Sequence, residues 1–109
     1  MNVWDEEAFL RRCRNKPDRA KRLIVMFLED APLLLDKIKA EVNAEDFLAI
    51  HSSAHSMKGM AANLGALKLT ESAAALEVAS RDFLGDECVA IYNVIEQEFN
   101  MLAPLLRDY

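Results

Sequence analysis

Residues 43–65 read NAEDFLAIHSSAHSMKGMAANLG, and this stretch decides the fold. Its apolar positions recur at steps of three and four residues, which is the spacing of one face of an α-helix. These positions are Phe47, Ile50, Ala54, Met57, Ala61 and Leu64. Asn43 is expected to cap the start of the helix, and Gly65 to end it in the left-handed conformation that glycine adopts easily. The stretch therefore predicts a helix that ends at Leu64 and buries one of its sides.

Four further helices are predicted, two before this one and two after it. The sequence shows no strand pattern and no internal repeat. A short helix covers about residues 5–15, and a long one runs over about 17–42. Another follows over about 66–82, and the last starts near Asp86. Because the connections are short, neighbouring helices must run antiparallel. The sequence therefore predicts an all-α fold, an up-down antiparallel four-helix bundle with an additional short N-terminal helix, formed by residues 1–109 as a single domain.

The apolar faces of these helices are expected to meet in one core. Their inner positions are expected to be Leu23, Met26, Phe27, Ala31, Leu34 and Ile38, then Leu69, Ala73, Leu76 and Phe83, and finally Val89, Tyr92, Ile95, Phe99, Leu102 and Leu106. Asp5 is expected to cap the first helix through its carboxylate. Pro32 predicts a kink in the long helix or a local break after Asp30, and Pro104 predicts a bent or frayed end of the last helix.

The overall composition argues against several classes of function. The chain has 109 residues and a formal net charge of −5 with scattered basic residues, so no nucleic-acid partner is expected. No apolar run approaches the roughly 20 residues that span a bilayer, and no signal peptide is predicted. Cys13 and Cys88 lie far apart with no CxxC pattern, so both are expected to be reduced thiols. These features predict a cytoplasmic protein that does not bind membranes.

His55 breaks the pattern of the central helix. At about 100° per residue it lies about 130° from the centre of the apolar face, so its imidazole is expected to be accessible to a partner. Its helical neighbours are Leu48, His51, Ser52, Lys58, Gly59 and Ala62. A glycine inside a helix costs on the order of 1 kcal/mol relative to alanine. Gly59 therefore indicates either room for a partner beside His55 or a packing contact that needs a small residue, and spacing alone leaves both readings open.

Four pairs of residues in and after this helix resemble the signature of histidine-containing phosphotransfer (HPt) domains. They are Ala54-His55, Lys58-Gly59, Leu64-Gly65 and Leu76-Glu77. The likeness covers about residues 18–83 and includes, more weakly, residues 27–30. It implies a four-helix-bundle module of a two-component multistep phosphorelay. Such a module accepts a phosphoryl group from the aspartate of one receiver domain and passes it to another.

The resemblance also implies roles for individual residues. His55 would be the phosphoacceptor, Lys58 would give electrostatic support, and Gly59 would give the partner room. Glu77 would orient the imidazole by accepting a hydrogen bond. Contacts with the partner are expected around the histidine, at Leu48, His51, Ser52 and Ala62.

The same resemblance implies the partners of the chain. They are response-regulator receiver domains and a hybrid sensor histidine kinase. The protein would be a monomeric phosphoryl carrier without kinase activity of its own. It would need no cofactor and no metal, because the magnesium ion is expected in the partner receiver domain.

Three other readings compete with phosphotransfer. His51 and His55 stand four residues apart and could share a zinc ion, but Ser52 replaces the glutamate of zinc-binding HExxH helices and no third ligand is obvious. An autonomous enzyme is not indicated, because the chain has no glycine-rich phosphate loop and no nucleophile elbow. A helical module that only docks a receiver or another partner would share the fold and the exposed face. The sequence leaves this last alternative open.

Overall fold

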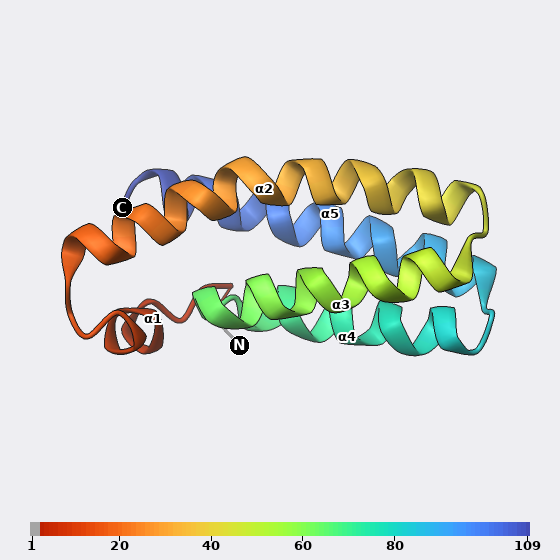
Figure 1. The fold of residues 1–109 in the computed structure, drawn as a ribbon, viewed down its shortest axis with the longest axis horizontal. Coiled ribbons are helices and arrows are strands. Elements are labelled where there is room, and N and C mark those ends of the chain that lie inside the picture. The colour runs from red at the N-terminus through yellow and green to blue at the C-terminus, as the bar shows by residue number, and fades with distance from the viewer. Residues whose placement is uncertain (1–2) are drawn as a thin grey trace.

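The computed structural model describes residues 3–109, which form five α-helices and no strand (Figure 1). The helices are α1, Glu6–Arg12; α2, Pro17–Asn43; α3, Phe47–Leu64; α4, Leu67–Arg81; and α5, Gly85–Arg107. The all-helical class predicted from the sequence is therefore confirmed. Within the described residues, no helix combines the length and the apolar character that crossing a membrane requires.

The four long helices lie side by side along the longest dimension of the molecule, which measures 42 × 24 × 20 Å (Figure 1). α3 packs against α2 and α4, and α5 packs against the same two helices. α1 contacts α2 and α3 at the end of the molecule where α3 turns into α4. Each long helix therefore has two long neighbours and keeps one side exposed to solvent.

The start of α3 differs from the prediction. Asp46 caps the helix by accepting a hydrogen bond from the Ala49 N–H at 3.2 Å, whereas Asn43 is the last residue of α2. Glu45, with φ 53°, makes the turn between the two helices. Asn43 and Asp46 are both good capping residues. Because α2 extends through Asn43, only Asp46 is left to cap α3.

Gly65 ends α3 as predicted, and only glycine fits there. Its φ is 80°, and a Cβ at this position would lie 2.7 Å from the carbonyl oxygen of Asp5. The Asp5 N–H donates to the Gly65 carbonyl at 2.8 Å, and the Trp4 indole N–H donates to the Leu64 carbonyl at 2.8 Å. Asp5 also caps α1, as predicted, by accepting from the Ala8 N–H at 3.1 Å. The N-terminal segment therefore lies directly on the turn between α3 and α4.

Neither internal proline breaks its helix. α2 continues through Pro32, and α5 continues through Pro104 to Arg107. The predicted break after Asp30 and the predicted fraying of the last helix are therefore wrong. Both prolines lie on the exposed sides of their helices. Water can satisfy the carbonyl group that each proline leaves without its helical hydrogen bond.

The core confirms the predicted inner face of α3, where only Phe47 is partly exposed. On other helices some residues expected inside are exposed instead: Leu23, Met26, Phe83 and Val89. The buried face of α2 consists of Ala20, Ile24, Phe27, Ala31, Leu35, Ile38 and Val42, and Leu34 is half-buried. Apolar residues occupy two adjacent stripes of α2, and packing against α3 and α5 selects one of them.

Candidate functional site

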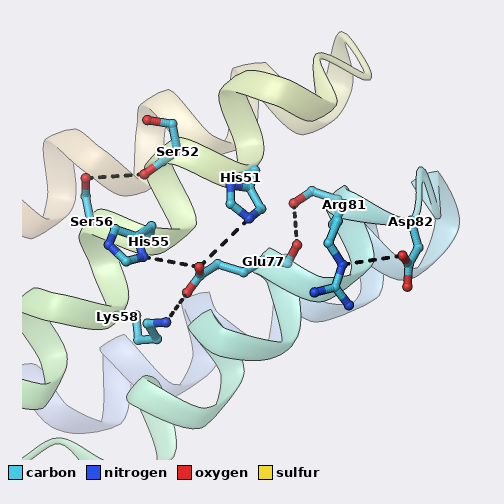
Figure 2. Close-up of polar contacts among 9 residues, drawn as sticks. His51, Ser52, His55, Ser56, Lys58, Glu77, Arg81 and Asp82 are labelled. Atoms are coloured by element: carbon cyan, nitrogen blue, oxygen red, sulfur yellow. Dashed lines mark hydrogen bonds and ion pairs between the residues drawn. The ribbon is translucent and has the colours of Figure 1, made fainter.

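His55 lies on the outer face of α3, on the side away from the core (Figure 2). Its side chain is 69% exposed, whereas Ala54 and Met57 on the other side of the helix are fully buried. The accessible position predicted from helical spacing is therefore confirmed. Another protein can approach the imidazole ring from solvent.

A glutamate of α4, Glu77, connects three side chains of α3 (Figure 2). Its Oε2 lies 3.2 Å from His55 Nδ1, and its Oε1 lies 2.7 Å from Lys58 Nζ. His51 Nε2 lies 4.0 Å from the same Oε2. The Glu77 side chain is only 12% exposed, and its Oε1 forms an ion pair with Lys58. Two imidazoles and one ammonium group therefore surround a single, largely buried carboxylate.

Close packing of α3 on α4 lets a glutamate of one helix reach a histidine of the other. Small residues occupy buried positions on both helices, among them Ala54 and Ala61 on α3 and Ala73 on α4. The distance between two helix axes depends on the side chains at the contact, so these alanines bring the helices together. Glu77 follows Ala73 by one helical turn and lies on the same side of α4, which directs its carboxylate to the edge of the contact.

The electrostatics of the site fix the protonation state of Glu77. Burial tends to raise the pKa of this carboxyl, but the hydrogen bonds and positive charges of Lys58 and His55 outweigh burial and lower the pKa below its ordinary value. Glu77 is therefore ionised near neutral pH, and an ionised carboxylate only accepts hydrogen bonds. It follows that Nδ1 of His55 carries the proton in this contact. In the neutral imidazole, the lone pair then resides on Nε2.

Gly59 has open space around it. The residue is exposed, and a Cβ at this position would meet no atom of residues 3–109 within 4 Å. The alternative that Gly59 makes a helix-packing contact is therefore wrong, because no packed neighbour requires a small residue there. The missing side chain leaves the surface of α3 open next to His55.

We call the four predicted partner contacts around His55 the rim: Leu48, His51, Ser52 and Ala62. These residues differ in how far they are exposed to solvent. The exposed members are Leu48 and Ser52, and the partly exposed members are His51 and Ala62. The Ala62 carbonyl accepts a hydrogen bond from the Arg12 guanidinium of α1. Spacing along α3 did not predict this contact or the approach of His51 to Glu77. Both contacts join segments that are distant in sequence, so no local pattern could have indicated them.

Within residues 3–109, no three histidine, cysteine, aspartate or glutamate side chains are grouped so that they could hold a metal ion. His51 and His55 instead face the carboxylate of Glu77. The ammonium of Lys58, at 2.7 Å from this carboxylate, places a positive charge where a zinc ion would have to bind. The geometry therefore gives no support to the zinc reading.

Fold and site together define a class of protein: a helical module that presents an exposed histidine, in contact with a carboxylate of the neighbouring helix, on the face of a helix. The family model of the Hpt domain matches residues 22–103, so the chain belongs to the Hpt domain family. Among solved structures, the chain is similar to histidine-containing phosphotransfer protein B (HptB) from Pseudomonas aeruginosa PAO1. That similarity has a TM-score of 0.91 and 25% sequence identity, and it covers 97% of this chain and 92% of that chain. No curated protein sequence matches the chain significantly.

Family membership and the structural likeness give the chain a histidine phosphotransfer role in phosphorelays. HPt proteins are phosphotransfer carriers and not kinases. The family implies phosphorelay partners such as receiver domains and kinases.

Proposed function

We propose that this chain accepts a phosphoryl group on His55 from the aspartate of one receiver domain and passes it to another receiver domain. The observation that carries the proposal is the contact of His55 Nδ1 with the ionised carboxylate of Glu77 at 3.2 Å. This contact keeps the proton on Nδ1, so that Nε2 presents its lone pair on a side chain that is 69% exposed. A phosphoacceptor needs both an unprotonated nitrogen and access for a folded partner.

In the proposed transfer, the Nε2 lone pair of His55 attacks the phosphorus atom of the receiver's aspartyl phosphate. The N–P bond forms as the bond between phosphorus and the aspartate oxygen breaks, and the aspartate leaves as a carboxylate. The proton on Nδ1 stays in place, so the phosphorylated ring carries a positive charge that faces Glu77. The reverse reaction on a second receiver returns His55 to its neutral form. No proton has to leave the site in either direction, and the main contribution of the module is to position the ring.

Lys58 supplies a positive charge that can serve two anions in turn. Its ammonium pairs with Glu77 in this structure, at 2.7 Å. After phosphorylation the positive imidazole of His55 takes its place at Glu77, and the flexible lysine side chain can turn to the phosphoryl oxygens one helical turn away. There it stabilises the negative charge of the transferred group.

The remaining contributions to the transfer are steric and external. Gly59 keeps the approach to His55 open, and the rim contacts the bound receiver. The magnesium ion and the other catalytic groups belong to the receiver, so the chain needs no cofactor of its own.

The finer description of the protein follows from the same proposal. Residues 1–109 act as a single domain, in which α2 to α5 form the antiparallel four-helix bundle of the family and α1 is an additional helix. The protein works as a monomeric carrier without kinase activity. The buried thiols of Cys13 and Cys88 are free, which fits a reducing compartment, and we expect the protein in the cytoplasm.

A phosphoryl-transfer assay tests the proposal. Receiver domains from the same genome are labelled on their aspartate and incubated with the protein. We expect an alkali-stable, acid-labile label on the protein that is absent in His55→Gln. His51→Gln is the matched control, because it removes a histidine one helical turn away and should keep the label. Absence of transfer from every receiver would refute phosphotransfer in favour of a docking module, and label retained in His55→Gln would refute the site.

A further inference from the structure

A hollow next to His51, between the start of α3 and the end of α4, has no part in holding His55. It is lined by Phe47, Leu48, His51, Ser80, Arg81 and Phe83. Leu48 and Phe83 are the most exposed large apolar side chains of residues 3–109, at 84% and 73%. We call Phe47, Leu48 and Phe83 the apolar corner. Apolar side chains that gather on a surface in this way indicate a contact with another molecule.

Phe83 is an unusual residue for its position. It follows α4 in the left-handed region, with φ 58°. The Phe83 N–H donates to the Ser80 carbonyl and the Leu84 N–H to the Ala79 carbonyl, which is the Schellman pattern of a helix end. Glycine is the usual residue at this point, because a Cβ is disfavoured in the left-handed conformation. The ring packs edge-on against Phe47, with centroids 5.6 Å apart, but stays largely exposed, so fold stability does not explain a phenylalanine here.

The apolar corner is continuous with the phosphoacceptor. Leu48 and His55 are seven residues apart and therefore lie on the same side of α3, about 10 Å apart along its axis. His51 lies between them, lines the hollow and faces Glu77 at 4.0 Å. Figure 2 shows His51 between His55 and Arg81 at the end of α4. One contact surface on α3 and α4 can therefore include both the histidine and the corner.

A partner that contacts His55 through an interface of typical area would also cover the apolar corner. A typical interface covers about 800 Å² on each partner, which corresponds to a disc with a radius of about 16 Å. A disc of this size centred on His55 extends past Leu48 to the hollow. Arg81 lines the hollow and pairs with Asp82 at 3.6 Å, so the charge of its guanidinium is matched within the chain, and the exposed apolar side chains beside it suit an apolar patch of the partner.

We propose that the apolar corner is a docking site for the receiver domain that exchanges the phosphoryl group with His55, and that it contributes much of the affinity. This inference rests on the proposed function. Binding energy at interfaces is concentrated in a few residues, often aromatic, that the partner covers. Apart from Leu48, the rim residues around His55 are polar or small, and they favour access and transfer. The apolar corner, one step further along the same face, holds the receiver in place.

Two truncations test the docking site in transfer kinetics. They are Phe83→Gly and Leu48→Ala, with Leu33→Ala as control, because Leu33 is 70% exposed on α2 and outside the hollow. The donors are the receiver domains of the same genome, phosphorylated with acetyl phosphate. We expect the KM for the receiver to rise about fivefold to tenfold in each corner variant, with the maximal rate within about twofold of wild type. Phe83→Gly should melt no lower than wild type, because glycine suits the left-handed conformation.

The outcomes separate the docking site from the proposed function. An unchanged KM in both corner variants, with normal transfer by the wild type, would overturn the docking site and leave phosphotransfer standing. If the wild type accepts no label from any receiver, phosphotransfer fails and the docking site fails with it. If Phe83→Gly instead weakens self-association in sedimentation experiments and leaves KM unchanged, the corner belongs to a second copy of the chain and the receiver assignment is wrong.

Discussion

Substitution of Gly59 should change stability and function in opposite directions. A Cβ at this position would meet no atom of the described part of the chain within 4 Å, and the backbone of Gly59 is not in the left-handed region, so an added side chain introduces no strain. Alanine is favoured over glycine inside a helix by about 0.8–1.0 kcal/mol. In a domain of this size, that difference raises the melting temperature by about 4 °C. We therefore expect Gly59→Ala to be more stable than the wild type.

Gly59→Glu extends the same reasoning to function. Glutamate is a good helix former, so this variant should be at least as stable as the wild type. Its side chain would extend from α3 one turn from His55, into the space that the receiver must enter, and would add negative charge near the phosphoryl group. We expect the transfer rate at a fixed receiver concentration to fall about tenfold or more. Ala75→Glu is the control, because it adds the same charge at an exposed position of α4.

Thermal unfolding followed by circular dichroism and the label-transfer assay measure both effects on the same samples. Transfer by Gly59→Glu at the wild-type rate would refute the clearance argument, because the partner would then not need the open space. A melting temperature of Gly59→Ala below that of the wild type would refute the stability argument. It would reveal a packed neighbour that the structure does not contain.

Three further predictions concern the carboxylate and the helix ends. Glu77→Ala leaves Nδ1 of His55 without its hydrogen-bond acceptor and should lower the transfer rate about 10- to 100-fold. The helical circular dichroism should stay unchanged. An unchanged transfer rate would contradict the orienting role of Glu77. Because the folded-state pKa of Glu77 is lowered, its stabilising contribution is full above the unfolded-state pKa and is lost as the pH falls through the folded-state pKa. Urea unfolding from pH 7 towards pH 3 should therefore show a larger loss for the wild type than for Glu77→Gln, and equal losses would contradict this. Gly65→Ala would place a Cβ 2.7 Å from the Asp5 carbonyl oxygen at φ 80° and should cost about 1–2 kcal/mol or more in urea unfolding. Gly85→Ala, whose nearest Cβ contact would be at 3.5 Å, is the control and should be neutral or stabilising.

The outer face of α3 was predictable because it depends on a single helix. The direction of a side chain around a helix follows from sequence spacing, and so the exposure of His55 and the burial of Ile50 and Met57 agree with the prediction. The pairing of His55 with Glu77 is different, because spacing does not say which helix packs alongside α3. Only the family resemblance pointed to Glu77, and neither source indicated that His51 faces the same carboxylate.

The errors lie where a second element makes the choice. Leu23 and Met26 continue the apolar pattern of α2 as well as its buried residues do, and only packing against α3 and α5 leaves them outside. Asn43 and Asp46 are equally suitable caps, and the length of α2 decides between them. Phe83 continues the apolar spacing of α4, but the helix ends before it and the left-handed turn directs the ring outwards.

The three basic groups around Glu77 suggest how a small module keeps the transfer reversible. In this structure Lys58 matches the charge of the carboxylate, and His55 contacts the same carboxylate through Nδ1 at 3.2 Å. In the phosphorylated state proposed above, the imidazolium of His55 replaces the lysine at Glu77, and the lysine turns to the phosphoryl group. The Glu77 carboxylate then has a positive partner in both the free and the phosphorylated state, and the phosphoryl group has one when it is bound. The electrostatic field of the protein therefore does not strongly favour either state. A carboxylate that faced His55 alone would favour the positively charged, phosphorylated ring and would hinder onward transfer. If Lys58 balances the charge of Glu77 in this way, its removal should slow the release of the phosphoryl group from His55 more than its capture.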